Sequence, residues 1–325
     1  MKAVRIHHTG PDVLVVEDVE TPKPPPGTIL VKVGVSGVNY TDVMARQGIY
    51  MSRESGRDLP RTMGTEVAGV VTAVGEGVEP DLVGSRVVAF VEGGYAEYAV
   101  ADRRLTFRLP ESVELGDAVA FLVQGITAWE LLVDRARLRE GETVLVHSAA
   151  GGVGSLAVQL AHHLGASRVI ATASTASKLA LASRLGATDT VNYTEPGWAD
   201  RVLDLTDGRG VDVVIEAVGG DIGEESLRIL ADNGRLVVYG VASKRMSAFA
   251  GSQLMQRNQA VLGYWLTSRL SPGSATAEIV PRLLQLADAG ELTAIVQHVF
   301  PLERAAEAHQ ALADRGTVGK VALLA

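Results

Sequence analysis

The sequence contains no cysteine, and this absence excludes several kinds of chemistry at once. A chain of 325 residues without a thiol forms no disulfide and supplies no thiolate to a metal, an iron–sulfur cluster or a catalytic step. No apolar run approaches the ~20 residues that span a bilayer, and the N-terminus lacks the apolar stretch of a secretory signal. These absences predict a cytoplasmic protein that makes no membrane contact.

The sequence also lacks any block of basic residues. Its net charge is −8 and its pI is about 5.4, whereas nucleic-acid binding usually requires a basic face. We therefore expect no nucleic-acid partner. Apolar residues make up 47% and charged residues 21%, which is typical of a globular chain with ample material for one large or two ordinary domains.

The first ~120 residues favour β-structure. They are rich in Val, Gly and Pro, and their apolar runs are short and separated by turns. Several short strands at such spacing predict a partly closed barrel rather than a parallel sheet. The expected strands span residues 13–19, 29–35, 67–74, 86–91 and 96–100.

The pattern changes near residue 120, where helical spacing begins and strands then alternate with helices. Short apolar strands separated by helices of ~10–15 residues predict βαβ units and a parallel sheet covered on both faces. The expected strands span residues 143–147, 168–173, 190–192, 211–218 and 235–239, and the expected helices span 155–164 and 176–185.

After about residue 265 the α/β pattern ends. Amphipathic helices are expected over residues 277–289 and 302–313, and a last strand over 318–324. The simplest organisation is an α/β domain of residues 123–264 inserted into a β-rich domain of residues 1–122 and 265–325.

A glycine-rich loop lies between the first α/β strand and its helix. In His147-Ser-Ala-Ala-Gly-Gly-Val-Gly154, the three small-residue positions of a dinucleotide fingerprint are Ala149, Gly151 and Gly154. The N–H groups of Gly152 and Val153 and the dipole of the helix would bind the pyrophosphate. The alternative is an ordinary strand–helix turn that holds no ligand.

No carboxylate follows the second α/β strand, where an NAD-selective site places Asp or Glu about 20 residues after the loop. That position holds Ser174, and Lys178 follows it. A hydroxyl and an ammonium suit a 2′-phosphate, and Tyr193 could add a phenolic donor. The pattern favours NADPH over NADH. The alternatives are that Ser174 only caps a helix and that Lys178 is only a solvated helix residue.

These motifs resemble those of the zinc-independent, zeta-crystallin-like quinone oxidoreductases of the medium-chain dehydrogenase/reductase superfamily. The most specific match runs from Gly141-Glu142 through Ala149-Ala-Gly-Gly-x-Gly154 to Gln159. The resemblance covers essentially the whole chain. It is also carried by Asn39-Tyr-Thr-Asp42, Gly48-Ile-Tyr50, Gly64-Thr-Glu-x-Ala-Gly69 and Gly316-Thr-Val-Gly-Lys-Val321.

The resemblance implies a fold and a set of site residues. The fold is a Rossmann-type doubly wound parallel sheet inserted into a GroES-like, partly closed barrel. The site is an interdomain cleft with Asn39, Tyr40 and Tyr50 as catalytic residues, although each tyrosine could equally be an ordinary half-buried aromatic. The implied cofactor-binding residues are Asn39, Thr127, Ala149, Gly151, Gly152, Val153, Gly154, Ser174, Lys178, Tyr193, Val218, Gly240 and Lys320.

The resemblance argues against a catalytic zinc ion. Where zinc alcohol dehydrogenases of the superfamily carry Cys, His and Cys, we place Asn39, Thr65 and Gln124, none of which is a good zinc ligand. Without a Lewis acid, the acceptor must delocalise the incoming electrons in its own π system.

The resulting function hypothesis is an NADPH-dependent, zinc-independent reductase that transfers hydride to small-molecule quinones. One alternative is a reductase of enoyl thioesters or other α,β-unsaturated carbonyls, and Tyr50 suits either reaction. An alternative of another class is a non-catalytic NADPH-binding protein. The resemblance further implies a homodimer.

Overall fold

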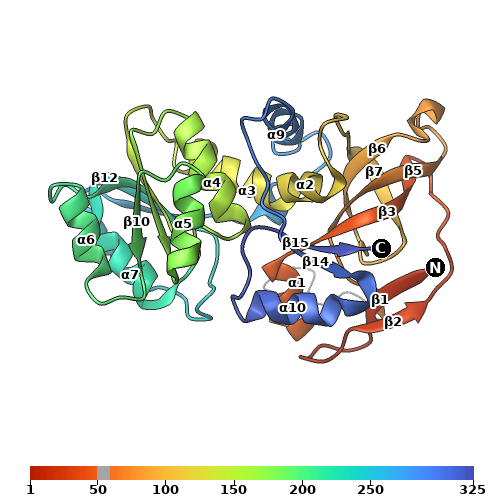
Figure 1. Ribbon diagram of the computed structural model, residues 1–325, viewed down its shortest axis with the longest axis horizontal. Coiled ribbons are helices and arrows are strands. Elements are labelled where there is room, and N and C mark those ends of the chain that lie inside the picture. The colour runs from red at the N-terminus through yellow and green to blue at the C-terminus, as the bar shows by residue number, and fades with distance from the viewer. Residues whose placement is uncertain (50–58) are drawn as a thin grey trace. The chain divides into compact units, whose positions relative to one another are not determined.

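The computed structural model describes residues 1–49 and 59–325. Within these ranges the chain forms two compact units. We call residues 1–123 with 271–325 the β-rich unit, and residues 124–270 the α/β unit. Figure 1 labels many of the elements of both units.

The β-rich unit contains a six-stranded sheet in the order β14-β15-β3-β5-β6-β7. Strand β3 pairs with β7 as well as with β5, so four of these strands close on themselves. The partly closed barrel expected from the sequence is therefore confirmed. The strands are β3 (Thr28–Val38), β5 (Glu66–Val74), β6 (Arg86–Val91), β7 (Tyr98–Arg108), β14 (His298–Pro301) and β15 (Val321–Leu324).

Strand β7 is longer than the sequence pattern indicates, because the charged residues Asp102, Arg103 and Arg104 interrupt its apolar alternation. Its first half pairs with β3 and its second half with β6. This change of partner along β7 closes the sheet into a barrel. Inside it, alternate residues of β3 such as Ile29, Val31 and Val33 are buried in one apolar cluster.

A three-stranded sheet in the order β2-β1-β4 and several helices complete the β-rich unit. Strand β1 was not expected from the sequence, although Val4 and Ile6 are buried in it. These elements are β1 (Lys2–Ile6), β2 (Val15–Asp18), β4 (Arg61–Thr62), α1 (Tyr40–Gln47), η1 (Pro80–Leu82), α2 (Leu115–Ala120), α9 (Ile279–Asp288), η5 (Leu302–Arg304) and α10 (Ala305–Ala313).

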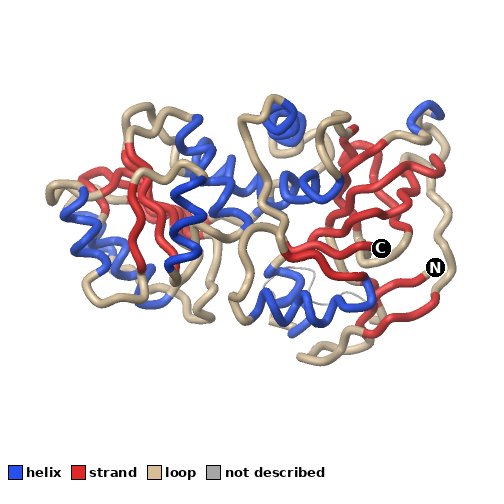
Figure 2. Tube along the Cα trace, viewed as in Figure 1, coloured by secondary structure: helices blue, strands red, loops and turns tan. Residues whose placement is uncertain are grey.

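The α/β unit is built on a second six-stranded sheet, in the order β10-β9-β8-β11-β12-β13. Every neighbouring pair is parallel, and helices lie on both faces of the sheet (Figure 2). The strand order reverses between β8 and β11, which confirms the Rossmann-type doubly wound fold. The strands are β8 (Thr143–Val146), β9 (Arg168–Ala173), β10 (Asp189–Asn192), β11 (Val211–Glu216), β12 (Leu230–Val238) and β13 (Ala260–Gly263).

Several helices of the α/β unit differ from the expected pattern. The helix after the glycine loop starts at Gly152, three residues earlier than expected, and two helices that the pattern did not reveal bury Trp198 and Leu227 against the sheet. The elements are η2 (Phe121–Gly125, across the boundary), α3 (Ile126–Glu130), η3 (Leu131–Arg135), α4 (Gly152–His163), α5 (Ala176–Arg184), α6 (Trp198–Leu205), α7 (Gly220–Arg228), α8 (Gly251–Gln256) and η4 (Leu266–Ser268).

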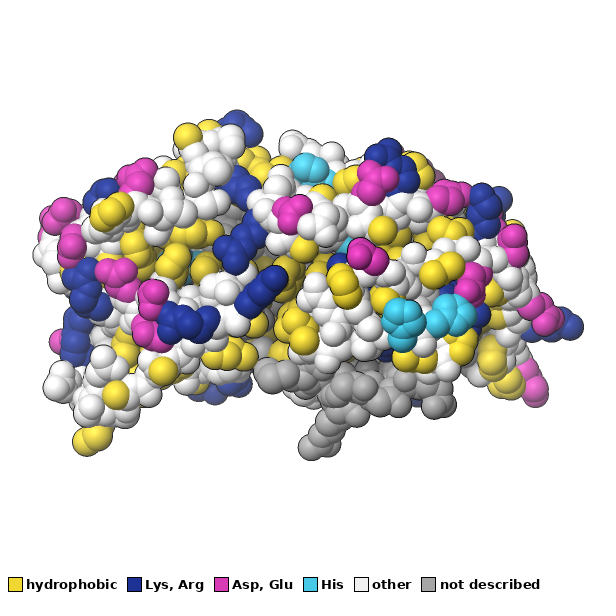
Figure 3. Space-filling view, turned by 90° about the horizontal axis from the view of Figure 1, so that it is seen from below, with side chains coloured by type: hydrophobic (Ala, Val, Ile, Leu, Met, Phe, Trp, Pro, Cys, Tyr) yellow, Lys and Arg dark blue, Asp and Glu magenta, His cyan; other side chains and the backbone are white. Residues whose placement is uncertain are grey.

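One helical stretch, Leu115–Arg135, is long and apolar enough to cross a membrane by length and composition alone. However, 72% of its most apolar window is buried within the protein. Burial of this kind is typical of a core helix. On the face drawn in Figure 3, acidic and basic side chains are interspersed over most of the surface.

Candidate functional site

The glycine loop follows β8 and packs tightly against the backbone that precedes it. A Cβ atom at Gly154 would lie 2.3 Å from the carbonyl oxygen of Ser148, and one at Gly152 would lie 2.2 Å from the Gln124 side chain. Ser148 itself adopts a left-handed conformation with a φ of 51°. The loop therefore requires glycine at position 154, where the contact is with backbone, whereas at position 152 the Gln124 side chain would have to move.

The first turn of α4 presents unpaired donors. In the described part of the chain the structure records no acceptor for the backbone N–H groups of Gly152, Val153 and Gly154. Ala149, at the first small-residue position, is fully buried, and its N–H donates to the carbonyl of Thr172 in β9 at 3.0 Å. The loop is thereby fixed to the sheet, and the N-terminus of α4 remains able to bind an anion.

A fully buried histidine anchors the start of this loop. His147 Nδ1 lies 2.7 Å from the hydroxyl of Thr172, and Nε2 lies 2.8 Å from the hydroxyl of Ser226. Because Ser226 donates its own proton to the carbonyl of Ile222, it must accept from His147. The ring is thus neutral with its proton on Nε2, and burial lowers the pKa of His147 to about 3.

The residues after β9 lie at the start of α5. The side chain of Thr175, not Ser174, caps this helix by accepting from the N–H of Lys178 at 3.4 Å. The capping alternative for Ser174 is therefore wrong. Ser174 and Lys178 are both half-buried.

The other expected contacts of the dinucleotide follow the carboxyl ends of β10, β11 and β12. Tyr193 packs edge-on against the His147 ring. Val218 is buried, and its N–H donates to the Glu216 carboxylate at 2.5 Å. A Cβ at Gly240 would lie 3.0 Å from the carbonyl of Ala217. The structure therefore places all of these residues along one edge of the parallel sheet.

Glu216 organises the turn after β11. One of its carboxylate oxygens accepts the N–H groups of Val218 and Gly219, and the other is buried without a hydrogen bond among the described residues. Burial raises the pKa of this carboxyl group, while the two backbone donors lower it. Glu216 is not part of any motif that the sequence offered.

In the β-rich unit, Asn39 and Lys320 meet in a buried polar network. Asn39 Nδ2 donates to Glu66 at 2.7 Å, and Asn39 Oδ1 accepts from the Lys320 ammonium at 2.8 Å. Lys320 also donates to Glu66, whose second oxygen accepts from the N–H of Val123 at 3.0 Å. Glu66 and Lys320 are completely buried and Asn39 is 4% exposed. The two charges thus compensate each other and fix both ends of the Asn39 amide.

The network continues through Asp42, which accepts from the N–H of Asn39 at 2.8 Å and from the hydroxyl of Tyr95 at 3.0 Å. Since Tyr95 donates to Asp42, it accepts from His309 Nε2 at 3.1 Å. Burial raises the pKa of Asp42 to about 6 and lowers that of His309 to about 3. At neutral pH the histidine is therefore uncharged.

The remaining expected site residues fall in different places. Tyr40 is half-buried at the start of α1, and Tyr50 lies outside the described residues. Thr127 is buried in α3 and forms a hydrogen bond with the hydroxyl of Tyr264. Burial raises the pKa of Tyr264, and the bond to Thr127 opposes that rise. Asn39, Tyr40 and Lys320 belong to the β-rich unit, and all other described site residues belong to the α/β unit.

The residues at the positions of the zinc ligands do not fit zinc. Asn39 is already bonded to the Lys320 ammonium, and a buried ammonium repels a divalent cation. Thr65 and Gln124 offer only a hydroxyl and an amide. Among residues 1–49 and 59–325, no three His, Asp or Glu side chains are grouped to hold a metal ion.

Comparisons with known proteins agree with this arrangement. The family model described as "Alcohol dehydrogenase GroES-like domain" matches residues 25–111, and "Zinc-binding dehydrogenase" matches residues 152–289. A quinone oxidoreductase of Pseudomonas aeruginosa is 36% identical over 97% of this chain and 96% of its own length. A 2-haloacrylate reductase of a Burkholderia species is 34% identical over 100% of this chain and 98% of its own.

The fold recurs in the structure of Escherichia coli quinone oxidoreductase complexed with NADPH, which has a TM-score of 0.91 and 31% identity over 100% of both chains. The fold and these matches define an oxidoreductase of the medium-chain dehydrogenase/reductase superfamily. Within that superfamily, the chain belongs to the quinone oxidoreductase family.

Proposed function

We propose that the protein binds NADPH at the carboxyl edge of its parallel sheet and uses it to reduce quinones. The observation that carries the proposal is the first turn of α4, where the N–H groups of Gly152, Val153 and Gly154 have no acceptor among the described residues. Such a helix N-terminus suits a pyrophosphate. The NADPH complex of the Escherichia coli relative supports this choice of ligand.

The preference for NADPH rests on the segment after β9. Ser174 and Lys178 are half-buried and lie in or just before α5, and the segment carries no carboxylate to repel a 2′-phosphate. Since Thr175 provides the helix cap, the Ser174 hydroxyl is available to a ligand. Tyr193, Val218 and Gly240 complete the contacts along the same edge.

Asn39 is proposed as the catalytic amide of the β-rich unit. The amide donates one N–H to Glu66 and accepts one hydrogen bond from Lys320. A second N–H and a second lone pair therefore remain for the nicotinamide ribose or the substrate carbonyl. Because Lys320 is completely buried, we assign it to positioning Asn39 rather than to direct contact with the cofactor.

The donor set around Asn39 provides no Lewis acid, so the acceptor must stabilise the incoming electrons by conjugation. When bound, the reduced nicotinamide supplies a hydride, and one further proton converts a quinone into the hydroquinone. Tyr40, Tyr50 or solvent would deliver that proton. The chain's own contribution is to orient both reactants and exclude water.

A panel of acceptors tests this proposal by the loss of NADPH absorbance. We expect turnover with small quinones and loss of most activity in Asn39→Ala, with Gln310→Ala, which removes an exposed amide in α10 of the same unit, as the matched control. Turnover of 2-haloacrylate or crotonyl thioesters with inert quinones would contradict the quinone assignment. Micromolar NADPH binding without turnover of any acceptor would instead favour a non-catalytic NADPH-binding protein.

A second candidate function is the reduction of an activated C=C bond. The Burkholderia relative, which matches this chain along its full length, is named for that reaction on 2-haloacrylate. The hydride would then go to a carbon conjugated with a carbonyl group, and a proton would go to the neighbouring carbon. Comparing kcat/KM for a quinone and for 2-haloacrylate in one preparation separates the two candidates.

We also infer a homodimer. Among the described residues strand β13 pairs with β12 alone, so it is an edge strand, and its residues Ala260–Leu262 are half-buried. An edge of this kind is a surface that another chain can extend. Light scattering should give twice the chain mass of 34.2 kDa, and a monomer at micromolar concentration would contradict the inference.

A further inference from the structure

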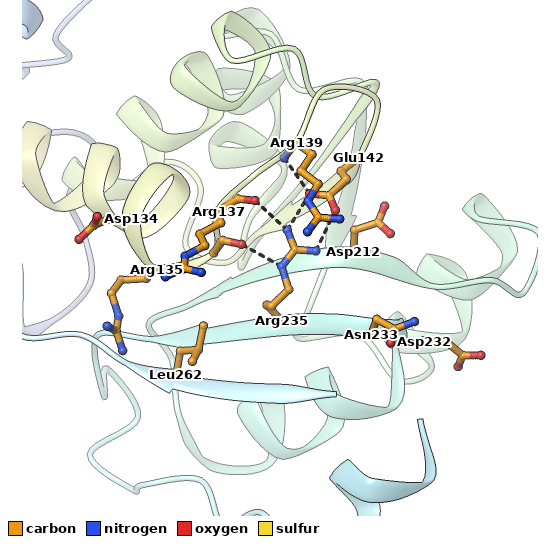
Figure 4. A pocket seen from close by; sticks show the side chains of 11 residues that line it. Asp134, Arg135, Arg137, Arg139, Glu142, Asp212, Asp232, Asn233, Arg235 and Leu262 are labelled. Atoms are coloured by element: carbon orange, nitrogen blue, oxygen red, sulfur yellow. Dashed lines mark hydrogen bonds and ion pairs between the residues drawn. The ribbon is translucent and has the colours of Figure 1, made fainter. Parts of the chain in front are cut away.

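A cavity of about 600 Å³ lies in the α/β unit at the amino ends of the strands. Figure 4 shows its walls, which come from the end of η3 and the loop after it and from the starts of β8 and β11, with side chains of β12 and β13. Glu142 directly precedes β8, and Asp212 is the second residue of β11. The dinucleotide loop follows the carboxyl end of β8, so the cavity occupies the opposite edge of the sheet.

The two edges cannot share one small anion. Strand β8 has four residues, which at ~3.3 Å each separate the edges by roughly 13 Å. The cavity is therefore separate from the dinucleotide loop, and its volume lies in the usual range of ligand sites.

Three of the arginines that line the cavity have no carboxylate partner among the described residues. Each of its four carboxylates is paired with an arginine: Asp134 with Arg269, Glu142 with Arg235, Asp212 with Arg209 and Asp232 with Arg257. The three other arginines that line it, Arg135, Arg137 and Arg139, form no ion pair with any described residue. Three guanidinium groups thus remain for a ligand.

The loop that bears these arginines is held rigid from the sheet side. Arg235 reaches up from β12 and donates to the carbonyl of Ala136 at 2.8 Å and to that of Arg137 at 3.3 Å (Figure 4). The same guanidinium binds both oxygens of Glu142, which also accepts the N–H of Arg139 at 2.9 Å. The backbone is thereby fixed before any ligand arrives, which lowers the entropic cost of binding.

The sequence alternates in this loop as Arg135-Ala-Arg-Leu-Arg139. Ala136 is buried and Leu138 half-buried, while Arg137 and Arg139 are exposed. The Nε atom of Arg135 is buried and has no hydrogen-bond partner among the described residues. A buried donor without a partner is unfavourable, and an anionic oxygen in the cavity would supply the missing acceptor.

We propose that this cavity is a second ligand site, for a small anion with several phosphate or carboxylate groups. Guanidinium forks match the paired oxygens of both groups. The lining contains no aromatic side chain, and Ala136 and Leu262 are its only apolar residues. A nucleobase or an apolar tail would therefore gain little there, which favours a compact polyanion.

Calorimetric titration with inorganic pyrophosphate and, separately, with citrate tests the proposal. Excess NADP⁺ is present in one arm of each titration, so that binding at the glycine loop is recognised by its loss. The test variant is Arg135→Gln/Arg137→Gln/Arg139→Gln. The matched control is Lys23→Gln/Lys32→Gln/Arg184→Gln, which removes three exposed cations located elsewhere.

We expect saturable binding of one ion per chain that persists with NADP⁺, weakens about tenfold or more in the test variant and stays unchanged in the control. The tighter of the two probes identifies the phosphate or carboxylate class. Equal losses in both triple variants would reduce the effect to general electrostatics and overturn the proposal. Binding only of a single-stranded oligonucleotide, with neither small anion bound, would overturn it in favour of a nucleic-acid surface.

Discussion

The two units hold their ligand-binding groups in position in different ways. At the carboxyl edge of the parallel sheet the prepared groups belong to the backbone, and glycine at Gly152 and Gly154 keeps side chains away from them. Around Asn39 the prepared group is a side chain, which the fully buried pair of Glu66 and Lys320 holds in place.

The two regions should therefore respond differently to substitution. A backbone site tolerates no added volume, whereas a site held by buried charge tolerates no lost partner. Substitutions in the first region should therefore reduce ligand affinity with little change in stability. Removal of one buried charge in the second region should destabilise the protein, whereas removal of the Asn39 amide, which leaves Glu66 and Lys320 paired with each other, should mainly reduce activity.

The largest effect is expected for Lys320→Met. This change leaves the Glu66 carboxylate buried without a counter-charge, and unfolding free energy should fall by about 3–5 kcal/mol. Lys2→Met, which removes an exposed pair with Glu303, should change stability far less, because solvent screens that pair. Denaturant unfolding measures both. The double variant Lys320→Met/Glu66→Gln should recover part of the loss, and the absence of any recovery would show that charge pairing is not the cause.

Gly154→Ala should come next in size. The new Cβ would lie 2.3 Å from the Ser148 carbonyl oxygen, so the loop must move away from its ligand. We expect NADPH affinity to fall by about a hundredfold, or roughly 3 kcal/mol. Gly116→Ala, whose Cβ meets nothing within 4 Å, should leave it unchanged. Fluorescence titration with NADPH compares the two, and equal affinities would refute the steric argument.

Acid should destabilise the protein through its buried histidines. The pKa of His147 and of His309 falls from 6.5 to about 3 on folding, so the unfolded chain binds more protons between these values. Stability is full above pH 6.5 and is lost as the pH falls, by about 2 kcal/mol per histidine near pH 5.

Asp42 opposes this loss, because its pKa rises from 3.8 to about 6 on folding. It stabilises the fold as the pH falls through that window, by about 1 kcal/mol near pH 5. The net change on acidification remains destabilising. Urea unfolding as a function of pH tests the balance, and His309→Gln should flatten the curve. A curve of unchanged slope would mean that His309 is charged in the folded state.

The smallest effect is expected for Lys178→Ala. NADPH affinity should fall by about tenfold while NADH affinity barely changes, since only NADPH carries the 2′-phosphate. Arg184→Ala, at the other end of α5, serves as the matched control. An equal loss for NADPH and NADH would show that Lys178 supports only the helix.

Much of the fold could be predicted from the sequence, because local patterns encode it. Strand β9 was predicted at its observed bounds, and the glycine loop was placed between β8 and α4. The strand β1 and the helices α6 and α7 were not predicted. Their apolar residues are buried by contacts with distant segments, and their short runs carry no strong periodicity.

The candidate site could be predicted only in part, because some of its residues are brought together from distant parts of the sequence. A glycine fingerprint is local, so Gly151–Gly154 could be identified. Glu66 and Lys320 lie 254 residues apart in the sequence, and no spacing rule connects them. The sequence nevertheless indicated that both charges are buried, because each residue is followed by apolar residues of an expected strand. A buried charge must be paired if it is ionised.

The most direct test is reduction of a small quinone by the metal-stripped protein with NADPH deuterated at C4. We predict full activity after treatment with a chelator and a slower rate with the deuterated cofactor, because the hydride passes to a conjugated acceptor without help from a metal ion. Activity that disappears on chelation and returns with zinc, or no NADPH consumption with any conjugated acceptor, would contradict the account.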